Sequence, residues 1–203
     1  TANNHDATTT SNPAVVDGIF GKARKFDGVD DYVSVSGGSD FDFSSNQDVT
    51  IDFWYKDINN TPGHTRGIMW MGGTGGWGSG LEWQIYTPDG SDDLVLQMAD
   101  GAAGLQQANA TGVLSDSDWH HWVFVKEDGV LKMYKDGILV NTGGTVTDAS
   151  ESDGTHSLYI GNRAIGTNAA NGYFDEVRIT NGQAFSADEV AEAYRLGANH
   201  KIS

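Results

Sequence analysis

The 203-residue sequence contains no cysteine and almost no proline. The lack of cysteine excludes disulfides and cysteine nucleophiles, so packing or a bound metal must fasten the loops if the protein is secreted. Proline occurs 3 times and glycine 27 times. This balance indicates a chain rich in turns, without the composition of a disordered segment.

Basic residues are also scarce, with 12 lysines and arginines against 28 acidic residues and a formal net charge of -16. So negative a surface repels phosphate backbones and anionic lipids, and we therefore exclude nucleic acid as a partner. No apolar run approaches the ~20 residues of a membrane-spanning helix, so we expect no membrane insertion. The acidic surface is compatible with cation binding or with simple solubility.

Alternating apolar and polar residues predict short β-strands between clusters of Gly, Asn and Asp. Residues 49–58 show this pattern clearly, since one strand face is apolar and the other is mixed. Asp128-Gly129 and Asp136-Gly137 have the chemistry of tight hairpin turns, in which the backbone adopts positive φ. They predict three consecutive antiparallel strands at roughly 119–126, 130–135 and 138–142.

A single segment near the end of the sequence predicts a helix. Ser186 and Glu189 have the spacing of a capping box. Val190 and Tyr194 lie one turn apart on a packing face, and Gly197 predicts the end of the helix.

Three motifs follow one another along the chain. They are KARKFDGVDDYV at 22–33, Trp119-His120-His121 with the hairpin behind it, and FDEVRI at 174–179 with the SADEVAEAY helix at 186–194. In these motifs the chain resembles the laminin-G-like, concanavalin A-like jelly-roll modules of secreted and surface proteins, from about Gly21 to Tyr194. The resemblance implies an all-β, antiparallel two-sheet jelly-roll sandwich with one short C-terminal helix. It also implies a module that binds or adheres rather than catalyses.

The sequence contains no recognisable catalytic constellation. Glycosidases with a jelly-roll fold need carboxylates spaced as E-x-D-x-E or E-x-D-x-x-E, which places an acid and a nucleophile on one strand face, and no such run occurs. A G-x-S-x-G elbow is also missing. His120 and His121 are adjacent on a predicted strand and point to opposite faces, so they cannot chelate one ion together. We therefore expect no enzyme.

Two acidic clusters could hold calcium, which binds six to eight oxygen atoms. One comprises Asp27, Asp30 and Asp31 around Gly28, and the other is Asp175-Glu176. The resemblance implies that the first and last strands lie side by side with a structural ion between them. It makes Asp27 and Asp175 the expected ligands, with Asp30 or a carbonyl near Gly28 as the third. The alternative is that these acids cap turns and pair with arginines such as Arg24 or Arg178.

A ligand site is predicted from an unusual tryptophan. Trp77 lies in GGWGSG, where no regular strand is expected, so its indole could stack on a sugar ring or fold back over an apolar gap. Both alternatives remain open. Asn162 and Arg163 supply polar donors on another loop, at the same rim as Trp77 or at the opposite one.

Three functions of different classes follow. The first is a non-catalytic module that binds a glycan or surface polysaccharide and is stabilised by calcium. The second is a structural or oligomerising domain of a surface layer, fibre or virion, and the third is a hydrolase or lyase with an unrecognised site. No linker divides residues 1–203, so we predict one domain. Because the sequence begins with Thr1, we expect a piece of a larger extracellular, cell-surface or virion protein, whose other domains are its partners.

Overall fold

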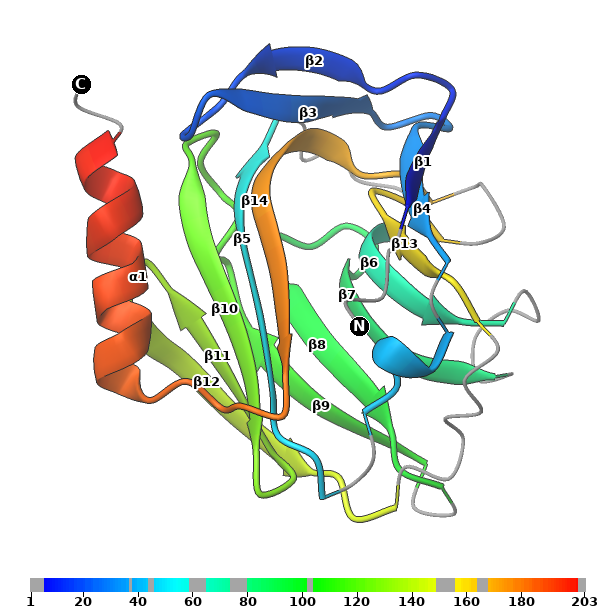
Figure 1. Ribbon diagram of the computed structural model, residues 1–203, viewed down its shortest axis with the longest axis vertical. Coiled ribbons are helices and arrows are strands. Elements are labelled where there is room, and N and C mark those ends of the chain that lie inside the picture. The colour runs from blue at the N-terminus through cyan, green and yellow to red at the C-terminus, as the bar shows by residue number, and fades with distance from the viewer. Residues whose placement is uncertain are drawn as a thin grey trace.

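The computed structural model describes residues 6–36, 38–43, 46–58, 65–73, 80–101, 104–148, 156–163 and 168–200. Its strands form two seven-stranded antiparallel sheets that face each other (Figure 1). Sheet A has the order β1 (Ala7–Thr10), β4 (Tyr32–Val35), β13 (Leu158–Ile160), β6 (Arg66–Gly72), β7 (Leu81–Thr87), β8 (Leu94–Ala99) and β9 (Leu105–Ala110). Sheet B has the order β12 (Ile138–Thr145), β11 (Val130–Lys135), β10 (His120–Glu127), β5 (Val49–Asp57), β14 (Asn171–Asn181), β3 (Lys22–Asp27) and β2 (Ala14–Asp17).

This arrangement confirms the predicted two-sheet sandwich. A 3₁₀ helix (Gly38–Asp40) follows β4, and the C-terminal helix α1 (Ala187–His200) follows β14. Among the helices in the described ranges, none is long and apolar enough to cross a membrane.

The hydrophobic core lies between the two sheets, where alternate residues of each strand meet. The ring of Phe53 on β5 lies 5.7 Å from that of Phe124 on β10 and 6.0 Å from that of Phe174 on β14. Sheet A supplies the opposing apolar side chains, including Met69, Met71, Trp83, Ile85, Leu94 and Leu96. The alternation seen in the sequence therefore packs one face of each sheet against the other.

The mixed face of β5 is buried as well, because α1 covers it. Trp54 is only 3% exposed, and its ring lies 5.8 Å from that of Tyr194 on the helix. In Figure 1 the helix runs beside β10, β11 and β12 on the outer side of sheet B. The sandwich thus has a third layer along part of sheet B.

Local turn and cap chemistry behaves as predicted. Asp128 and Asp136 have φ of 49° and 52°, and a glycine with φ of 81° follows each of them in its hairpin turn. At the start of α1, Ser186 N donates to Glu189 Oε2 (2.7 Å) and Glu189 N donates to Ser186 Oγ (3.3 Å), which is the predicted capping box.

Two glycines have roles that the sequence did not predict. Gly197 lies within α1 and does not end it. It is a glycine because a Cβ at this position would overlap the Trp54 indole. Gly143 lies on β12, where a Cβ would overlap the Gln107 carbonyl oxygen of β9. Both positions need glycine because the backbone there lies close to another part of the chain, a side chain at Gly197 and a backbone carbonyl at Gly143.

A buried ion pair joins the sheets at the end of β5 and the start of β6. Arg66 Nη1 donates to both carboxylate oxygens of Asp57, at 2.7 and 2.9 Å. Tyr55 Oη also donates to Asp57, and Arg66 Nε donates to Thr87 Oγ1. Burial, followed by the charge of Asp57, raises the pKa of Tyr55 well above its usual value.

Candidate functional site

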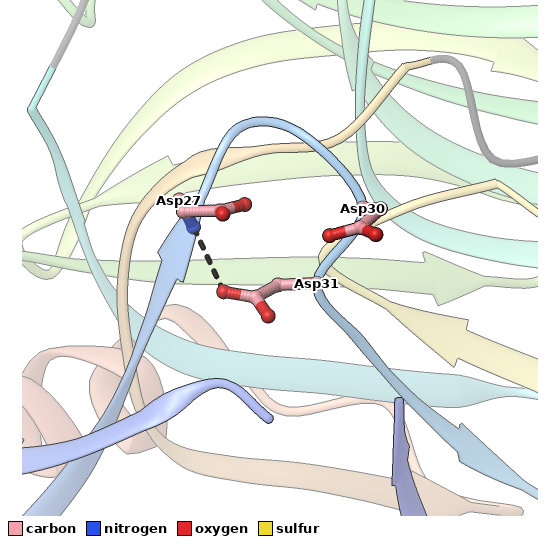
Figure 2. A group of neighbouring side chains, drawn as sticks. All are labelled: Asp27, Asp30 and Asp31. Atoms are coloured by element: carbon pink, nitrogen blue, oxygen red, sulfur yellow. Dashed lines mark hydrogen bonds between the residues drawn. The ribbon is translucent and has the colours of Figure 1, made fainter. Parts of the chain in front are cut away.

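The acidic loop, residues 27–31, carries β3 of sheet B into β4 of sheet A. Asp27, Asp30 and Asp31 each offer a carboxylate oxygen, and these atoms lie within 4.8 Å of one another. Figure 2 shows the three side chains on the inside of the turn, with the Asp27 N–H donating to Asp31 Oδ2 (3.1 Å). Gly28 turns the chain with φ of +79°. Three acids therefore lie close together where the chain passes from sheet B to sheet A.

The carboxylates of the acidic loop repel one another. Asp27 and Asp30 are exposed, whereas Asp31 is only 5% exposed. Burial, then the Asp27 charge and to a lesser degree the Asp30 charge, raise the pKa of Asp31. A cation among these oxygens would remove the repulsion, and carboxylates with backbone carbonyls are the ligand types that calcium takes.

Asp175 does not lie at the acidic loop. β3 and β14 pair as predicted, but the register places Asn171 opposite Asp27 and Phe174 opposite Arg24. Asp175 is thus roughly 13 Å along the strand from that position. Its carboxylate accepts hydrogen bonds from the N–H groups of Phe20 and Glu176, both at 2.9 Å.

The expected metal set is therefore corrected. The structure brings Asp27 and Asp30 together and adds Asp31, which is buried beside them. Asn171 is the β14 residue nearest the loop, since a Cβ at Gly28 would lie 2.8 Å from its Cβ. The motif FDGVDDY contained this third acid, but only the strand register could distinguish Asn171 from Asp175.

Asn162 and Arg163 are buried rather than exposed on a loop. They follow β13 and have exposed fractions of 0% and 2%. The Arg163 guanidinium lies over the Trp70 ring, 4.4 Å from its centroid, and burial lowers its pKa. Their expected role as ligand donors stays a prediction. Trp77 belongs to residues 74–79, which lie outside the described ranges.

Beneath Arg163, a row of polar and aromatic side chains crosses the outer face of sheet A. Strand pairing places these residues directly opposite one another on five neighbouring strands. We call this set the polar row: Tyr159, Trp70, Gln84, Gln97 and Gln107. It alternates along each strand with the core residues, so it faces away from the core.

Most of the polar row is covered in this structure, and its amides are not all satisfied. Trp70, Gln84 and Gln97 are at most 3% exposed. Gln84 Nε2 donates to Gln97 Oε1, while Gln84 Oε1 has no hydrogen-bond partner among the described residues. The Trp70 ring, with the Arg163 guanidinium over it, therefore lies beside Gln84, whose buried amide oxygen accepts no hydrogen bond among the described residues. Gln84 and Gln97 were not predicted as site residues, although each is a polar residue between two apolar neighbours.

His120 and His121 have separate surroundings, as their adjacent positions on one strand require. His120 contacts the carboxylates of Asp136 (2.6 Å) and Asp116 (2.7 Å). Burial lowers the pKa of His120, but its hydrogen bonds to these two acids outweigh that and raise it. His121 lies under α1, with its ring 5.2 Å from that of Trp54. The pair does not form a shared metal site.

Comparison with known proteins identifies relatives of this fold. The laminin G-type sequence profile of the concanavalin A-like lectin/glucanases superfamily matches residues 27–191. No curated protein matches the chain in sequence.

Solved structures with the same fold include clostridial toxin domains. The binding domain of Paraclostridial Mosquitocidal Protein 1 has a TM-score of 0.72 and 17% identity, over 95% of this chain and 48% of that one. The receptor binding domain of the botulinum neurotoxin C/D mosaic serotype has a TM-score of 0.75 and 14% identity, over 95% and 46%. A third structure is of botulinum neurotoxin type C, whose cell entry is described as dependent upon interaction with two ganglioside molecules. It has a TM-score of 0.70 and 14% identity, over 96% of this chain and 47% of that one. The chain spans about half the length of these structures.

Proposed function

Because the chain belongs to the concanavalin A-like lectin/glucanases superfamily, we propose that it is a non-catalytic module that binds a glycan. The polar row carries this proposal. Sugars present apolar ring faces and pairs of hydroxyls, which aromatic rings and planar amide or guanidinium groups recognise. Trp70 supplies the ring, Arg163 the guanidinium, and Gln84 and Gln97 the amides. The toxin domains of the same fold include proteins described as ganglioside-dependent, which supports a carbohydrate partner.

Arg163 is central to how a ligand would reach the polar row. Its guanidinium covers Trp70, and burial of its charge is unfavourable. Movement of this side chain from the Trp70 ring onto a sugar hydroxyl would expose the indole face. We propose an extracellular, cell-surface or virion location for such a module, within a larger protein.

Replacing Gln84 by methionine is expected to abolish the signal on a glycan array. The substitution keeps the length of the side chain but removes the amide from the centre of the polar row. Gln183→Met is the matched control, because Gln183 is exposed in the loop after β14 and should leave binding unchanged. Trp77→Ala, measured on the same array, tests the tryptophan predicted from the sequence.

Other outcomes of this array would favour other functions. Binding that survives Gln84→Met would place the ligand away from the polar row. A silent array together with multimeric elution in size-exclusion chromatography would favour a structural or oligomerising domain. Turnover of a polysaccharide that depends on one carboxylate would establish an enzyme instead.

We further propose that the acidic loop binds a structural calcium ion through Asp27, Asp30 and Asp31. The ion would neutralise carboxylates that connect one sheet to the other. If it binds only the folded state, calcium at 100 times its dissociation constant adds about 2.7 kcal/mol to the free energy of unfolding. EDTA should then lower the melting temperature, and Asp30→Asn should remove the difference between calcium and EDTA.

Asp175→Asn is the control for the calcium experiment, because Asp175 lies away from the acidic loop. Its melting temperature should still respond to EDTA, although the single amide oxygen of the variant can accept only one of the two hydrogen bonds from the Phe20 and Glu176 N–H groups. Identical melting of metal-free protein with and without calcium would rule out the ion.

A further inference from the structure

The two sheets do not close fully against each other beside β3 and β4. A cavity of about 190 Å³ opens to solvent there, between β3 and β14 of sheet B and β4 and β13 of sheet A. We call this cavity the inter-sheet slot. Because an apolar cavity of roughly 150 Å³ can hold benzene, the slot is large enough for one apolar side chain or a group of similar size.

The inside of the slot is apolar. Phe26 and Phe174 form its floor, with ring centroids 5.0 Å apart. Val33 and Ile160 lie opposite each other on β4 and β13 and line the sheet A side. The two phenylalanines are at most 3% exposed, whereas Val33 and Ile160 are only partly buried, so a ligand can reach the slot from solvent. A ligand that fills it would remove this apolar surface from water.

A β-bulge turns Val177 of β14 into the slot. The register between β14 and β5 shifts between Asp175 and Arg178, and Glu176 has φ of +49°. In a regular strand Phe174 and Val177 would point to opposite faces, yet both line the slot and pack against the core. Glu176, within the bulge, is exposed and lies at the rim.

Arg24 supplies a positive charge at the rim. It lies opposite Phe174 in the ladder between β3 and β14, so its side chain is on the same face as that ring. Its Nη1 donates to the Pro13 carbonyl oxygen (3.1 Å), and Arg24 forms no ion pair with any described residue. Its other guanidinium N–H groups can therefore bind a carboxylate, which guanidinium recognises with two parallel hydrogen bonds.

Glu176 supplies a negative charge at the same rim. Its carboxylate makes no hydrogen bond or ion pair with any described residue, Arg24 included. Its charge acts on Arg178, but that guanidinium is already bound to Asp52, with 2.9 Å from Nε to Oδ2. The Glu176 carboxylate is therefore open to an ammonium group.

The other two charged residues around the slot are occupied elsewhere. Lys22 Nζ forms an ion pair with Asp17. Asp175 lies opposite Trp54 in the ladder between β14 and β5, so its carboxylate is on the outer face of sheet B, where it accepts two backbone hydrogen bonds. The rim is thus left with one unpaired charge of each sign.

We propose that the inter-sheet slot binds a free apolar amino acid of about the size of leucine. The ligand's side chain would fill the slot, its α-carboxylate would accept hydrogen bonds from Arg24, and its α-ammonium group would donate to Glu176. Glu176 disfavours a ligand with only a carboxylate, and Arg24 disfavours one with only an ammonium group, so a ligand with both is selected. The slot is separate from the polar row and the acidic loop and does not rest on the functions proposed for them.

Calorimetric titration with L-leucine tests the proposal. We expect a dissociation constant of about 1 mM or tighter. Two compounds with the same branched chain carry only one of the charges: 4-methylpentanoate lacks the ammonium group, and 3-methylbutylamine lacks the carboxylate. Each should bind at least about tenfold more weakly than leucine.

Two variants test the rim and the interior of the slot. Arg24→Gln removes the cation and should weaken leucine binding at least about tenfold, without weakening that of 3-methylbutylamine. Arg195→Gln, the same change on an exposed part of α1, is its control. Val33→Phe fills the slot and should also weaken leucine binding. Val140→Phe, at an exposed position on the opposite edge of sheet B, should leave it unchanged.

Circular dichroism melts verify that these variants fold. The proposal is overturned if leucine at about 10 mM does not bind the wild type, or if 4-methylpentanoate binds as tightly as leucine. It is also overturned if folded Arg24→Gln binds leucine as the wild type does. Should Val33→Phe fail to fold, Arg24→Gln and the two leucine analogues still decide the question.

Discussion

Replacing Asp57 by asparagine should lower the free energy of unfolding by about 3–5 kcal/mol, as expected when one partner of a buried ion pair is removed. The Arg66 and Asp57 side chains are 7% and 2% exposed, so the buried guanidinium would keep its charge but lose the carboxylate that accepts two of its hydrogen bonds. The Tyr55 hydroxyl would also lose its charged acceptor. Chemical denaturation at constant pH measures the change.

Two comparisons separate the buried charge from other effects of this substitution. Asp17→Asn breaks an ion pair with Lys22 whose side chains are 89% and 68% exposed, and it should change stability little. Asp57→Leu combined with Arg66→Met removes both charges and should recover much of the loss. If Asp57→Asn were as mild as Asp17→Asn, water or a rearranged partner would have to solvate Arg66.

Replacing Lys126 by methionine is expected to stabilise the protein at pH 7, by up to about 3 kcal/mol for a pKa depressed by this much. Lys126 lies on β10 with 1% exposure, and burial lowers its pKa from 10.5 to about 8, against the opposing charge of Asp48. At pH 7 the folded protein therefore still holds an ammonium group, in a place where burial makes its charge unfavourable.

The same shift predicts how stability depends on pH. Between pH values of about 8 and 10.5, the unfolded chain binds more protons at Lys126 than the folded chain does. The free energy of unfolding therefore rises with pH in this window. Lys126→Met should lose this rise. Lys132→Met is the control and should keep the rise. The hydrogen bond to Glu127 raises the pKa of Lys132, so the stability that Lys132 contributes is instead lost as the pH increases. A wild-type profile equal to that of Lys126→Met would contradict the assignment.

The local features of this fold could be predicted from the sequence because their causes lie within a few residues. The Asp-Gly turns and the Ser186 capping box depend on backbone conformation and short hydrogen bonds, and all of them occur as expected. Alternation along residues 49–58 predicted which face of β5 enters the core, since side chains alternate on any strand. The three ordered motifs similarly indicated the family.

The candidate sites depended on pairings between distant segments, which alternation does not determine. The pairing of β3 with β14 was expected, but its register placed Asn171 rather than Asp175 opposite Asp27. Arg163 was expected on a loop at one rim of the fold, and the structure buries it with its guanidinium over the Trp70 ring. The polar row exists only because five strands align Gln84 with its neighbours.

The sequence by itself therefore determined the strands, their turns, the helix cap and the presence of an acidic loop, because these follow from short-range sterics and hydrogen bonding. Only the tertiary structure decided which of those elements meet. Strand register, the bulge at Glu176 and the docking of α1 through Gly197 are set by packing over long separations in the chain. Those contacts bring Arg24, Val33 and Glu176 around one slot between the sheets, which no local pattern encodes.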